Sequence, residues 1–250
     1  MEKVNGEVTE YTDPYAFANV TKPEDYKAFL AGEEKNAAHI FGAHERTVNG
    51  VKGVLFTVWA PKALSVSVVG EFNKYDGRVH LMEKIGDTGV FELFIPGLAA
   101  GCGYMYEIKR QGKGTTRKLD PVSRQISSVP ITASVVSDEN MSDSYAWNDG
   151  LWMIKRKKEA GKKKPVTVYE VSLTDWLKEK SADELVDFVK QEGYTHVCFL
   201  PVAEYLNEEM NGYSTLGYFA VTHRTGGRDA FKKLVDDCHN AGIGVIIDWN

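Results

Sequence analysis

The chain has 250 residues, of which 43% are hydrophobic and 26% charged, and its formal net charge is −5. This length suits one large domain or two ordinary ones, and the composition is typical of a globular protein. A net acidic chain gives no general reason to expect nucleic acid as a partner. No apolar stretch approaches membrane-spanning length, and the first residues lack the pattern of a signal peptide. We therefore expect a cytoplasmic protein that binds neither nucleic acid nor membrane.

The three cysteines, Cys102, Cys198 and Cys238, are odd in number and far apart in the chain. They do not have the spacing of a metal site, since structural zinc needs four clustered thiolate or imidazole ligands. Cys198 lies in an apolar stretch and Cys238 on the apolar side of a predicted helix, so both are expected to be small core residues. The sequence predicts reduced thiols and no metal site.

Residues 1–40 are predicted to form a helical or extended segment, with a short helix in TKPEDYKAFLAGEE and Pro23 near its start. Residues 54–136 then show apolar alternation, interrupted by Gly and Pro every dozen or so residues. The residues that share one side of a strand are Val54, Phe56, Val58 and Ala60, then Leu64, Val66 and Val68, then Tyr104, Tyr106 and Ile108. This pattern predicts an antiparallel β-sandwich over residues 41–140.

From residue 165 to 250 predicted strands alternate with predicted helices. The strands are PVTVYEVSL, THVCFLP and GVIIDW, and the helices are SADELVDFVKQEG and RDAFKKLVDDCHNAG. The first helix has a capping box, Ser181 with Glu184, and stops at Gly193; the second stops at Gly242. Near-continuous apolar strands in this order predict parallel βαβ units covered by helices.

Residues 141–164 are predicted to be a linker, and most of the basic run KRKKEAGKKKP, residues 155–165, lies within it. One interpretation is a tract that binds a polyanion. The alternative is a solvated linker or an exposed helix end, and the acidic net charge of the chain favours this second interpretation.

Six strings of the sequence resemble, in the right order, glycogen branching enzymes. FGAHERTVNGVKGVLFTVWAPKALSVSVVGEFNKYDGRVHLM, followed by GVFELFIPG, is similar to the sandwich module that precedes their barrel. The strings VYEVSL, THVCFLPVAEY, GYSTLGYFAVTHR and FKKLVDDCHNAGIGVIIDW are similar to the opening strands of their α-amylase-type barrel. The resemblance runs from about residue 22 to the end. It implies a multidomain fold, in which an all-β immunoglobulin-like sandwich precedes the first βαβαβ part of a TIM (β/α) barrel.

The resemblance also implies a retaining transfer, in which one carboxylate attacks the anomeric carbon and a second carboxylic acid protonates the departing oxygen. The 6-hydroxyl of another glucan chain takes the intermediate, which makes an α-1,6 branch from an α-1,4 chain. The nucleophile follows the fourth barrel strand and the acid/base the fifth, and no metal or organic cofactor takes part. Since three strands are predicted, the catalytic carboxylates are expected beyond Asn250 and the chain is expected to be inactive alone.

Two barrel residues match site positions of the resembled enzymes. Asp248 matches the acid that follows strand three in those enzymes, which supports the site and is not the nucleophile. The alternative is that Asp248 is a strand-end residue that accepts hydrogen bonds from local backbone N–H groups. Tyr213 matches a tyrosine that lines the subsite of the cleaved sugar, with plain loop packing as the alternative. Asn211 and Ser214 stand where the resembled enzymes have tryptophan and glutamine, which puts donor binding in doubt.

In the predicted sandwich, Tyr75 stands where the resembled enzymes usually have tryptophan, so its ring is a candidate for stacking on the sugars of an α-glucan. Asn73 and Asp76 would supply hydrogen bonds. Trp59 is a weaker candidate, because a tryptophan at such a strand end more often packs in the core. Elsewhere, four other residues are expected to be structural: Trp147, Trp152, His196 and His239.

The expected function is therefore that of the N-terminal part of a 1,4-α-glucan branching enzyme, with α-glucan as partner. A non-catalytic glucan-binding module with a vestigial barrel segment remains an alternative. Another member of the α-amylase superfamily, such as a debranching enzyme, is a further one.

Overall fold

The structure is a computed structural model that describes residues 2–4, 7–9, 17, 20–21, 23–127, 131–138 and 145–249. The chain divides into two compact units. Unit 1 is Met1–Ser123 with Ser127–Glu139, and unit 2 is Arg124–Ile126 with Asn140–Asn250. In the described part of the chain, no helix combines the length and apolar character needed to cross a bilayer.

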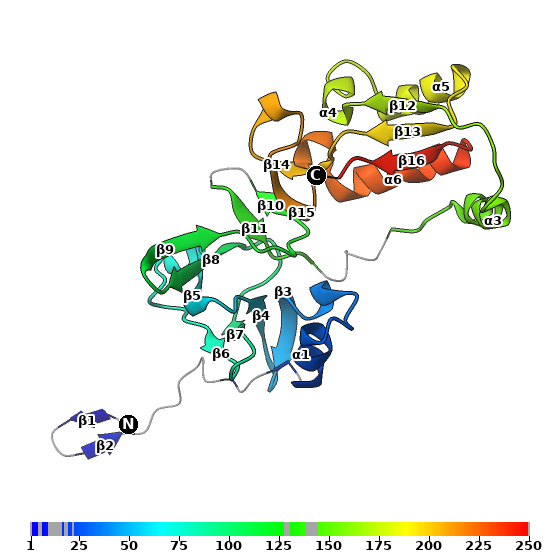
Figure 1. The fold of residues 1–250 in the computed structure, drawn as a ribbon. Helices are drawn as coiled ribbons and strands as arrows, with labels where there is room; N and C mark the ends of the chain where they lie inside the picture. The colour runs from blue at the N-terminus through cyan, green and yellow to red at the C-terminus, as the bar shows by residue number, and fades with distance from the viewer. Residues whose placement is uncertain are drawn as a thin grey trace. The chain divides into compact units, whose positions relative to one another are not determined.

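The larger part of unit 1 is built on two antiparallel sheets (Figure 1). The first has the order β3-β4-β7-β6, with β3 Gly42–Val48, β4 Val51–Trp59, β7 Val90–Pro96 and β6 Glu83–Lys84. The second has the order β10-β11-β8-β5 with β9 also on β8; its strands are β10 Ile126–Ser127, β11 Ala133–Val135, β8 Gly103–Arg110, β5 Ala63–Gly70 and β9 Lys113–Lys118. Side chains of both sheets, such as Phe56 and Tyr104, share one core cluster, which confirms the predicted antiparallel sandwich.

One predicted side-chain orientation in the sandwich is wrong, because Leu64 does not share a side of its strand with Val66 and Val68. Leu64 is 57% exposed, whereas Ala63, Val66 and Val68 lie in the core. The pairing of β5 with β8 shifts register between Ala63 and Ser65, so strict alternation fails at the start of this strand. A bulge of this kind turns one side chain to the other face of a sheet.

The short N-terminal elements are the hairpin of β1 Glu2–Val4 and β2 Glu7–Thr9, and the helix α1 Pro23–Leu30, which begins at proline as predicted. Helix α1 is fixed to the first sheet by Tyr26, whose hydroxyl donates to Oε2 of the buried Glu92 at 2.6 Å. Burial and this hydrogen bond raise the pKa of Tyr26, so the phenol remains a donor across the physiological range.

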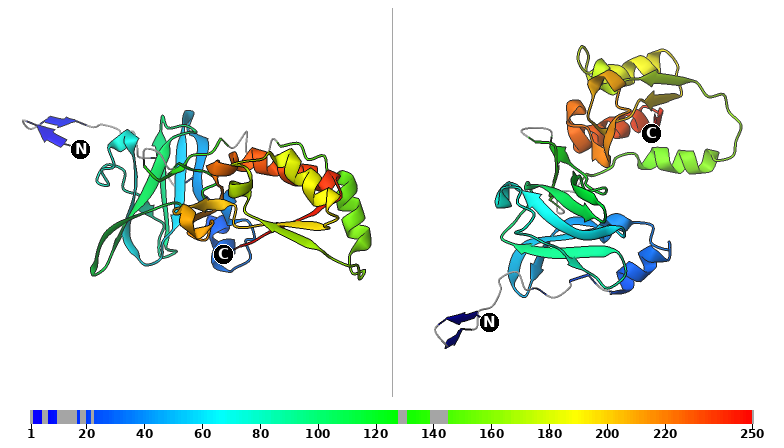
Figure 2. Two further views of the ribbon diagram at one scale, coloured as in Figure 1. Left: turned by 90° about the horizontal axis from the view of Figure 1, so that it is seen from above. Right: turned by 60° about the vertical axis from the view of Figure 1, so that its left-hand side comes forward.

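Unit 2 is built on three parallel strands in the order β12-β13-β16, with β12 Val168–Val171, β13 His196–Phe199 and β16 Gly244–Ile247. The connections carry α4 Leu173–Trp176, α5 Ala182–Gln191, the hairpin of β14 Ala203–Tyr205 with β15 Thr215–Val221, and α6 Gly227–Asn240. Helices α5 and α6 pack through a shared core cluster on one face of this sheet (Figures 1 and 2). The parallel βαβαβ order is therefore confirmed, as is the capping box of Ser181 with Glu184.

A helix occupies part of the predicted linker. Helix α3, Gly150–Glu159, contains the first half of the basic run, and Lys157 and Lys158 in its last turn are exposed. This agrees with the interpretation of an exposed helix end.

Candidate functional site

The carboxyl ends of the three parallel strands meet at one edge of the unit 2 sheet. Val171, Phe199 and Ile247 lie side by side in register, and Asp248 follows immediately. The backbone N–H of Asp248 donates to the carbonyl of Phe199 at 2.9 Å, which continues the pairing by one residue. Active sites of α/β folds form at this edge, because the connecting loops converge there. Asp248 therefore occupies the edge at which the sequence placed it.

Tyr213 reaches the same edge from the loop between the strands of the β14–β15 hairpin, and its hydroxyl donates a hydrogen bond to Oδ2 of Asp248. The loop turns sharply before the tyrosine, with the Tyr213 N–H donating to the Met210 carbonyl at 2.8 Å. Gly212 has a positive φ of 89°, and a Cβ there would lie 2.6 Å from the Pro201 carbonyl oxygen. Only glycine fits this position, so Gly212 is what allows Tyr213 to reach Asp248.

The carboxylate of Glu170 lies on the face of the sheet that α5 and α6 leave uncovered. Glu170, Cys198 and Ile246 are neighbours across the three strands on that face. The hydrogen bond to Asp248 raises the pKa of Tyr213 to about 12, with a smaller contribution from Glu170. Burial raises the pKa of the Cys198 thiol, and Glu170 and Asp248 raise it further. The site therefore holds a neutral phenol and a neutral thiol beside carboxylates, which suits hydrogen bonding to uncharged hydroxyls.

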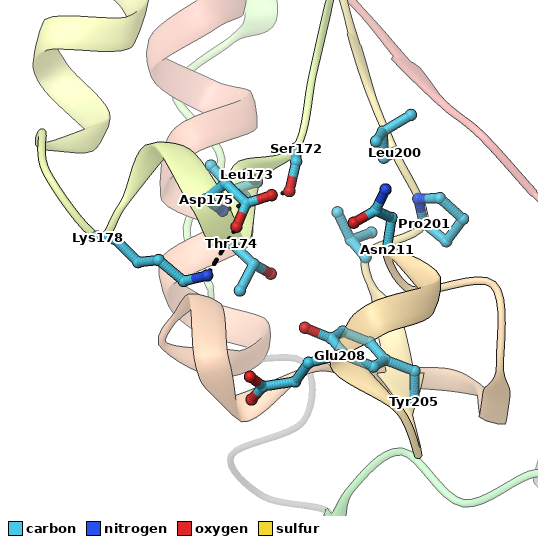
Figure 3. A pocket seen from close by; sticks show the side chains of 11 residues that line it. Ser172, Leu173, Thr174, Asp175, Lys178, Leu200, Pro201, Tyr205, Glu208 and Asn211 are labelled. Atoms are coloured by element: carbon cyan, nitrogen blue, oxygen red, sulfur yellow. Dashed lines mark hydrogen bonds and ion pairs between the residues drawn. The ribbon is translucent and has the colours of Figure 1, made fainter.

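A cleft opens beside these strand ends, between α4 and the turn that precedes Tyr213 (Figure 3). Asp175 and Lys178 pair on its α4 side at 2.7 Å, and Asn211 stands opposite with a positive φ of 48°. The residues that line the cleft combine hydroxyl, amide and carboxylate groups with the apolar Leu200 and Pro201. The polar lining residues are Ser172, Thr174, Asp175, Lys178, Tyr205, Glu208 and Asn211. Of these, the sequence had singled out Asn211 alone, and only as a departure from the resembled enzymes.

Sequence reasoning missed a buried ion pair next to the cleft residues Tyr205 and Glu208. Glu204 is 1% exposed, and its carboxylate accepts from Arg224 at 2.5 Å, His223 Nδ1 at 2.9 Å and Thr222 Oγ1 at 3.2 Å. The Arg224 guanidinium also lies 4.4 Å from the centre of the Tyr205 ring. These contacts hold β14 to the segment that follows β15 and position Tyr205, which lines the cleft. No local sequence signal pairs Glu204 in β14 with Arg224, which lies twenty residues later in the short turn His223–Thr225 after β15.

In unit 1, Tyr75 is half-buried on a turn after β5, and the Arg117 guanidinium lies 5.7 Å from its ring centre. Trp59 ends β4, is 46% exposed and packs edge-to-face on Phe29 at 5.4 Å, so the expectation that it packs in the core is wrong. The whole length of β5, Ala63–Gly70, separates the two aromatic residues along the sandwich. At about 3.3 Å per residue, this distance prevents them from forming one binding surface.

The expected polar companions of Tyr75 are engaged elsewhere. Asn73 is buried; its Oδ1 accepts from the Gly70 N–H and its Nδ2 donates to the Val68 carbonyl, both at 2.9 Å. A role for Asn73 in sugar binding is thus wrong, because it closes the turn instead. Asp76 pairs with Arg78 at 2.6 Å, and this hydrogen bonding lowers the pKa of Asp76 to about 2.

The remaining residues of interest have structural contacts. Trp152 stacks on His239 with ring centres 5.0 Å apart, and His239 Nδ1 lies 2.8 Å from Asp149 Oδ2, which joins α3 to α6. Trp147 is exposed beside Tyr145. His196 contacts the Thr195 hydroxyl through Nδ1 at 2.8 Å. Within the described ranges, no group of three or more His, Cys, Asp or Glu side chains is arranged to hold a metal ion.

Comparison with known proteins finds similarity along nearly the whole chain. Residues 40–123 match the family carbohydrate-binding module 48, the isoamylase N-terminal domain. Nearly the whole chain is similar to enzymes named 1,4-α-glucan branching enzyme GlgB. The chain is 42% identical to the enzyme of Methylococcus capsulatus, over 98% of this chain and 34% of that enzyme. It is also 42% identical to the enzyme of Thiobacillus denitrificans, over 100% of this chain and 34% of that enzyme. With the enzyme of Cellvibrio japonicus the identity is 40%, over 95% and 33%.

The chain thus spans about a third of the length of the curated relatives that it matches. The resemblance inferred from six strings of sequence is confirmed as a similarity to the N-terminal part of these enzymes. The fold is also similar to a crystal structure of a Salmonella typhimurium protein described as a candidate α-amylase. That likeness has a TM-score of 0.58 at 24% identity, and it covers 83% of this chain and 32% of the other.

Proposed function

We propose that this chain serves 1,4-α-glucan branching, as part of an enzyme that cuts an α-1,4 chain and rejoins it through an α-1,6 link. The similarity to branching enzymes over nearly its whole length supports this. The single structural observation that carries the proposal is the bond between Tyr213 and Asp248 at the carboxyl edge of the parallel sheet. Both residues were expected at a sugar site from sequence, and they lie in contact.

In this proposal Asp248 binds the sugar through hydrogen bonds and is not the nucleophile that attacks the anomeric carbon. Its carboxylate has acceptor capacity beyond the bond from Tyr213, so it can accept hydrogen bonds from glucose hydroxyls. Tyr213 orients that carboxylate and presents its ring to the sugar. The nucleophile and the acid/base would be two further carboxylates on later barrel strands, as the retaining template requires.

The domain assignment belongs to the same proposal. Residues 41–140 would be an α-glucan-binding module, with Tyr75 as a stacking residue. Residues 165–250 would be the first three strands of an α-amylase-type TIM barrel, joined to the module by residues 141–164. The match of residues 40–123 to carbohydrate-binding module 48 supports the first part, and the parallel order β12-β13-β16 supports the second. The three thiols outside disulfides favour a cytoplasmic location.

The test is a pair of assays on the purified chain. In affinity electrophoresis through amylose we expect retardation, and Tyr75→Ala should reduce it. In an iodine-staining assay on amylose we expect no branching, because the carboxylate pair is assigned to later strands. Formation of α-1,6 links by this chain alone would overturn the roles given to Asp248 and Tyr213, and failure to bind any α-glucan would overturn the proposal itself.

A second candidate is a non-catalytic glucan-binding module, which is favoured by the family match of the sandwich alone. The two candidates differ in which unit contacts glucan. If Tyr75→Ala abolishes retardation and Asp248→Asn leaves it unchanged, the binding module is the better description. If Asp248→Asn weakens binding as well, the strand-end site contributes.

A further inference from the structure

The turn that carries Tyr75 is held in an uncommon conformation. Lys74 and Tyr75, two consecutive non-glycine residues, both have left-handed backbones, with φ of 54° and 58°. L-residues rarely adopt this region, and strain of this kind persists only where surrounding contacts impose it. The Tyr75 N–H donates to the Gly70 carbonyl at 2.9 Å, which closes the turn but leaves the ring unconstrained.

The contacts that constrain Tyr75 come from the strands beneath it. Arg117 Nη2 donates to the Tyr75 carbonyl oxygen at 2.8 Å, and the same guanidinium lies 5.7 Å from the Tyr75 ring centre. One side chain therefore fixes the backbone of Tyr75 and interacts with its ring. An arginine can do both because the N–H groups in the plane of its guanidinium donate hydrogen bonds, while the face of the guanidinium attracts an aromatic ring.

Glu107 fixes the arginine in turn. It lies directly opposite Arg117 across β8 and β9, and its Oε2 accepts from Arg117 Nε at 3.1 Å. The turn passes so close to Glu107 that a Cβ on Gly77 would lie 2.1 Å from Oε1. Asp76 does not compete for the Arg117 guanidinium, because it accepts bidentate hydrogen bonds from Arg78. Glu107, Arg117 and Tyr75 form a chain of contacts from the sheet to the ring.

We propose that Arg117 and Glu107 are positioning residues that hold the Tyr75 ring ready to stack on a glucose unit of an α-glucan. The proposal deepens the function proposed above and rests on the glucan-binding role of Tyr75. A ring fixed before binding loses less conformational freedom on binding than a ring on a mobile loop. The Tyr75 ring is held in place and keeps part of its surface exposed, so the chain binds glucan more tightly through it.

The test measures binding of maltoheptaose, a linear α-1,4-linked oligosaccharide, to the full chain by titration calorimetry. We expect Tyr75→Ala to weaken binding about tenfold and Arg117→Met about three- to fivefold, with a smaller loss for Glu107→Gln. Arg110→Met is the matched control, since it removes a guanidinium from the same sheet, and it should leave the affinity unchanged. Arg117→Lys keeps the charge without the planar fork and should not restore the affinity.

A double-mutant cycle separates positioning from general damage. If Arg117 acts through Tyr75, Arg117→Met should cost nothing further in the Tyr75→Ala background. Additive losses, or unchanged affinity in Arg117→Met alone, would overturn the positioning role while the function proposed above stands. No effect of Tyr75→Ala would overturn the binding role of Tyr75 and the inference with it. Melting curves identify any variant that fails to fold, and Arg117→Lys then replaces Arg117→Met in the cycle.

Discussion

The hydroxyl of Tyr213 donates a hydrogen bond to Oδ2 of Asp248, although the two residues are 35 positions apart in the chain. The bond joins the loop inside the β14–β15 hairpin to the end of the third parallel strand. It keeps the phenol neutral and the carboxylate oriented at the edge where the strand ends converge.

This bond predicts a shifted titration of Tyr213. Its pKa is raised to about 12 by the bond to Asp248, so Asp248→Asn should lower the pKa back toward 10. Because the pKa is raised in the folded state, the linked stability is present below about pH 10 and lost as pH rises through 12. Carbon-13 tyrosine NMR resolves the titration, and Asp175→Asn is the control. An unchanged pKa in Asp248→Asn would contradict the bond.

A second prediction concerns the buried Asp120 in the sandwich. Its Oδ2 accepts from the hydroxyls of Tyr104 and Tyr106 at 2.7 and 3.1 Å, yet burial raises the pKa of Asp120 above its ordinary value. Because the pKa is raised in the folded state, protonation of Asp120 stabilises the fold. This contribution to stability is fully present below the unfolded pKa of 3.8 and is lost as pH rises through the folded pKa.

The measurement compares Asp120→Asn with the unaltered chain, because asparagine removes the titration and other carboxylates cancel in the difference. Urea unfolding at about pH 4.5 and about pH 7 should show that the unaltered chain gains stability relative to the variant at the lower pH. A difference that is the same at both pH values would show that Asp120 does not titrate as its burial requires.

The third prediction concerns the ion pair of Glu204 and Arg224. Arg224→Met leaves a buried carboxylate without its strongest partner and should lower the free energy of unfolding of unit 2 by about 2–3 kcal/mol. Adding Glu204→Gln to Arg224→Met should recover part of that loss, because the uncompensated charge disappears. Urea unfolding followed by tryptophan fluorescence measures this, since Trp59 is the one tryptophan outside unit 2. Strictly additive losses would argue against a coupled pair.

The fourth prediction is self-association through unit 2. On its sheet, Val168, Ile246 and Ile247 are 44%, 39% and 41% exposed, and large exposed apolar surface favours association. We expect the full chain to oligomerise in size-exclusion chromatography, whereas a chain shortened to end near residue 150 remains monomeric. Ile246→Lys should reduce the association, with Leu64→Lys in the sandwich as the control. A monomeric, cooperatively melting full chain would refute this prediction.

Local patterns in the sequence were sufficient for the order and type of the main elements. Period-two alternation predicted the antiparallel sandwich, and the capping box of Ser181 with Glu184 marked the start of α5. The position of Asp248 also followed, because a parallel strand delivers its next residue to a known edge of the sheet. Each of these conclusions depends on neighbours in the chain or on strand direction.

Contacts between distant segments were decided only by the tertiary structure. Leu64 points outward at a register shift between β5 and β8, and Arg117 reaches Tyr75 from another strand. The meeting of Tyr213 with Asp248 depends on how Gly212 passes Pro201. Residue patterns record which side of an element is apolar, whereas the path of each loop is set by close packing against segments that are remote in sequence. The sequence therefore determined which residues lie near the strand ends, and the packed loops decided which of them touch.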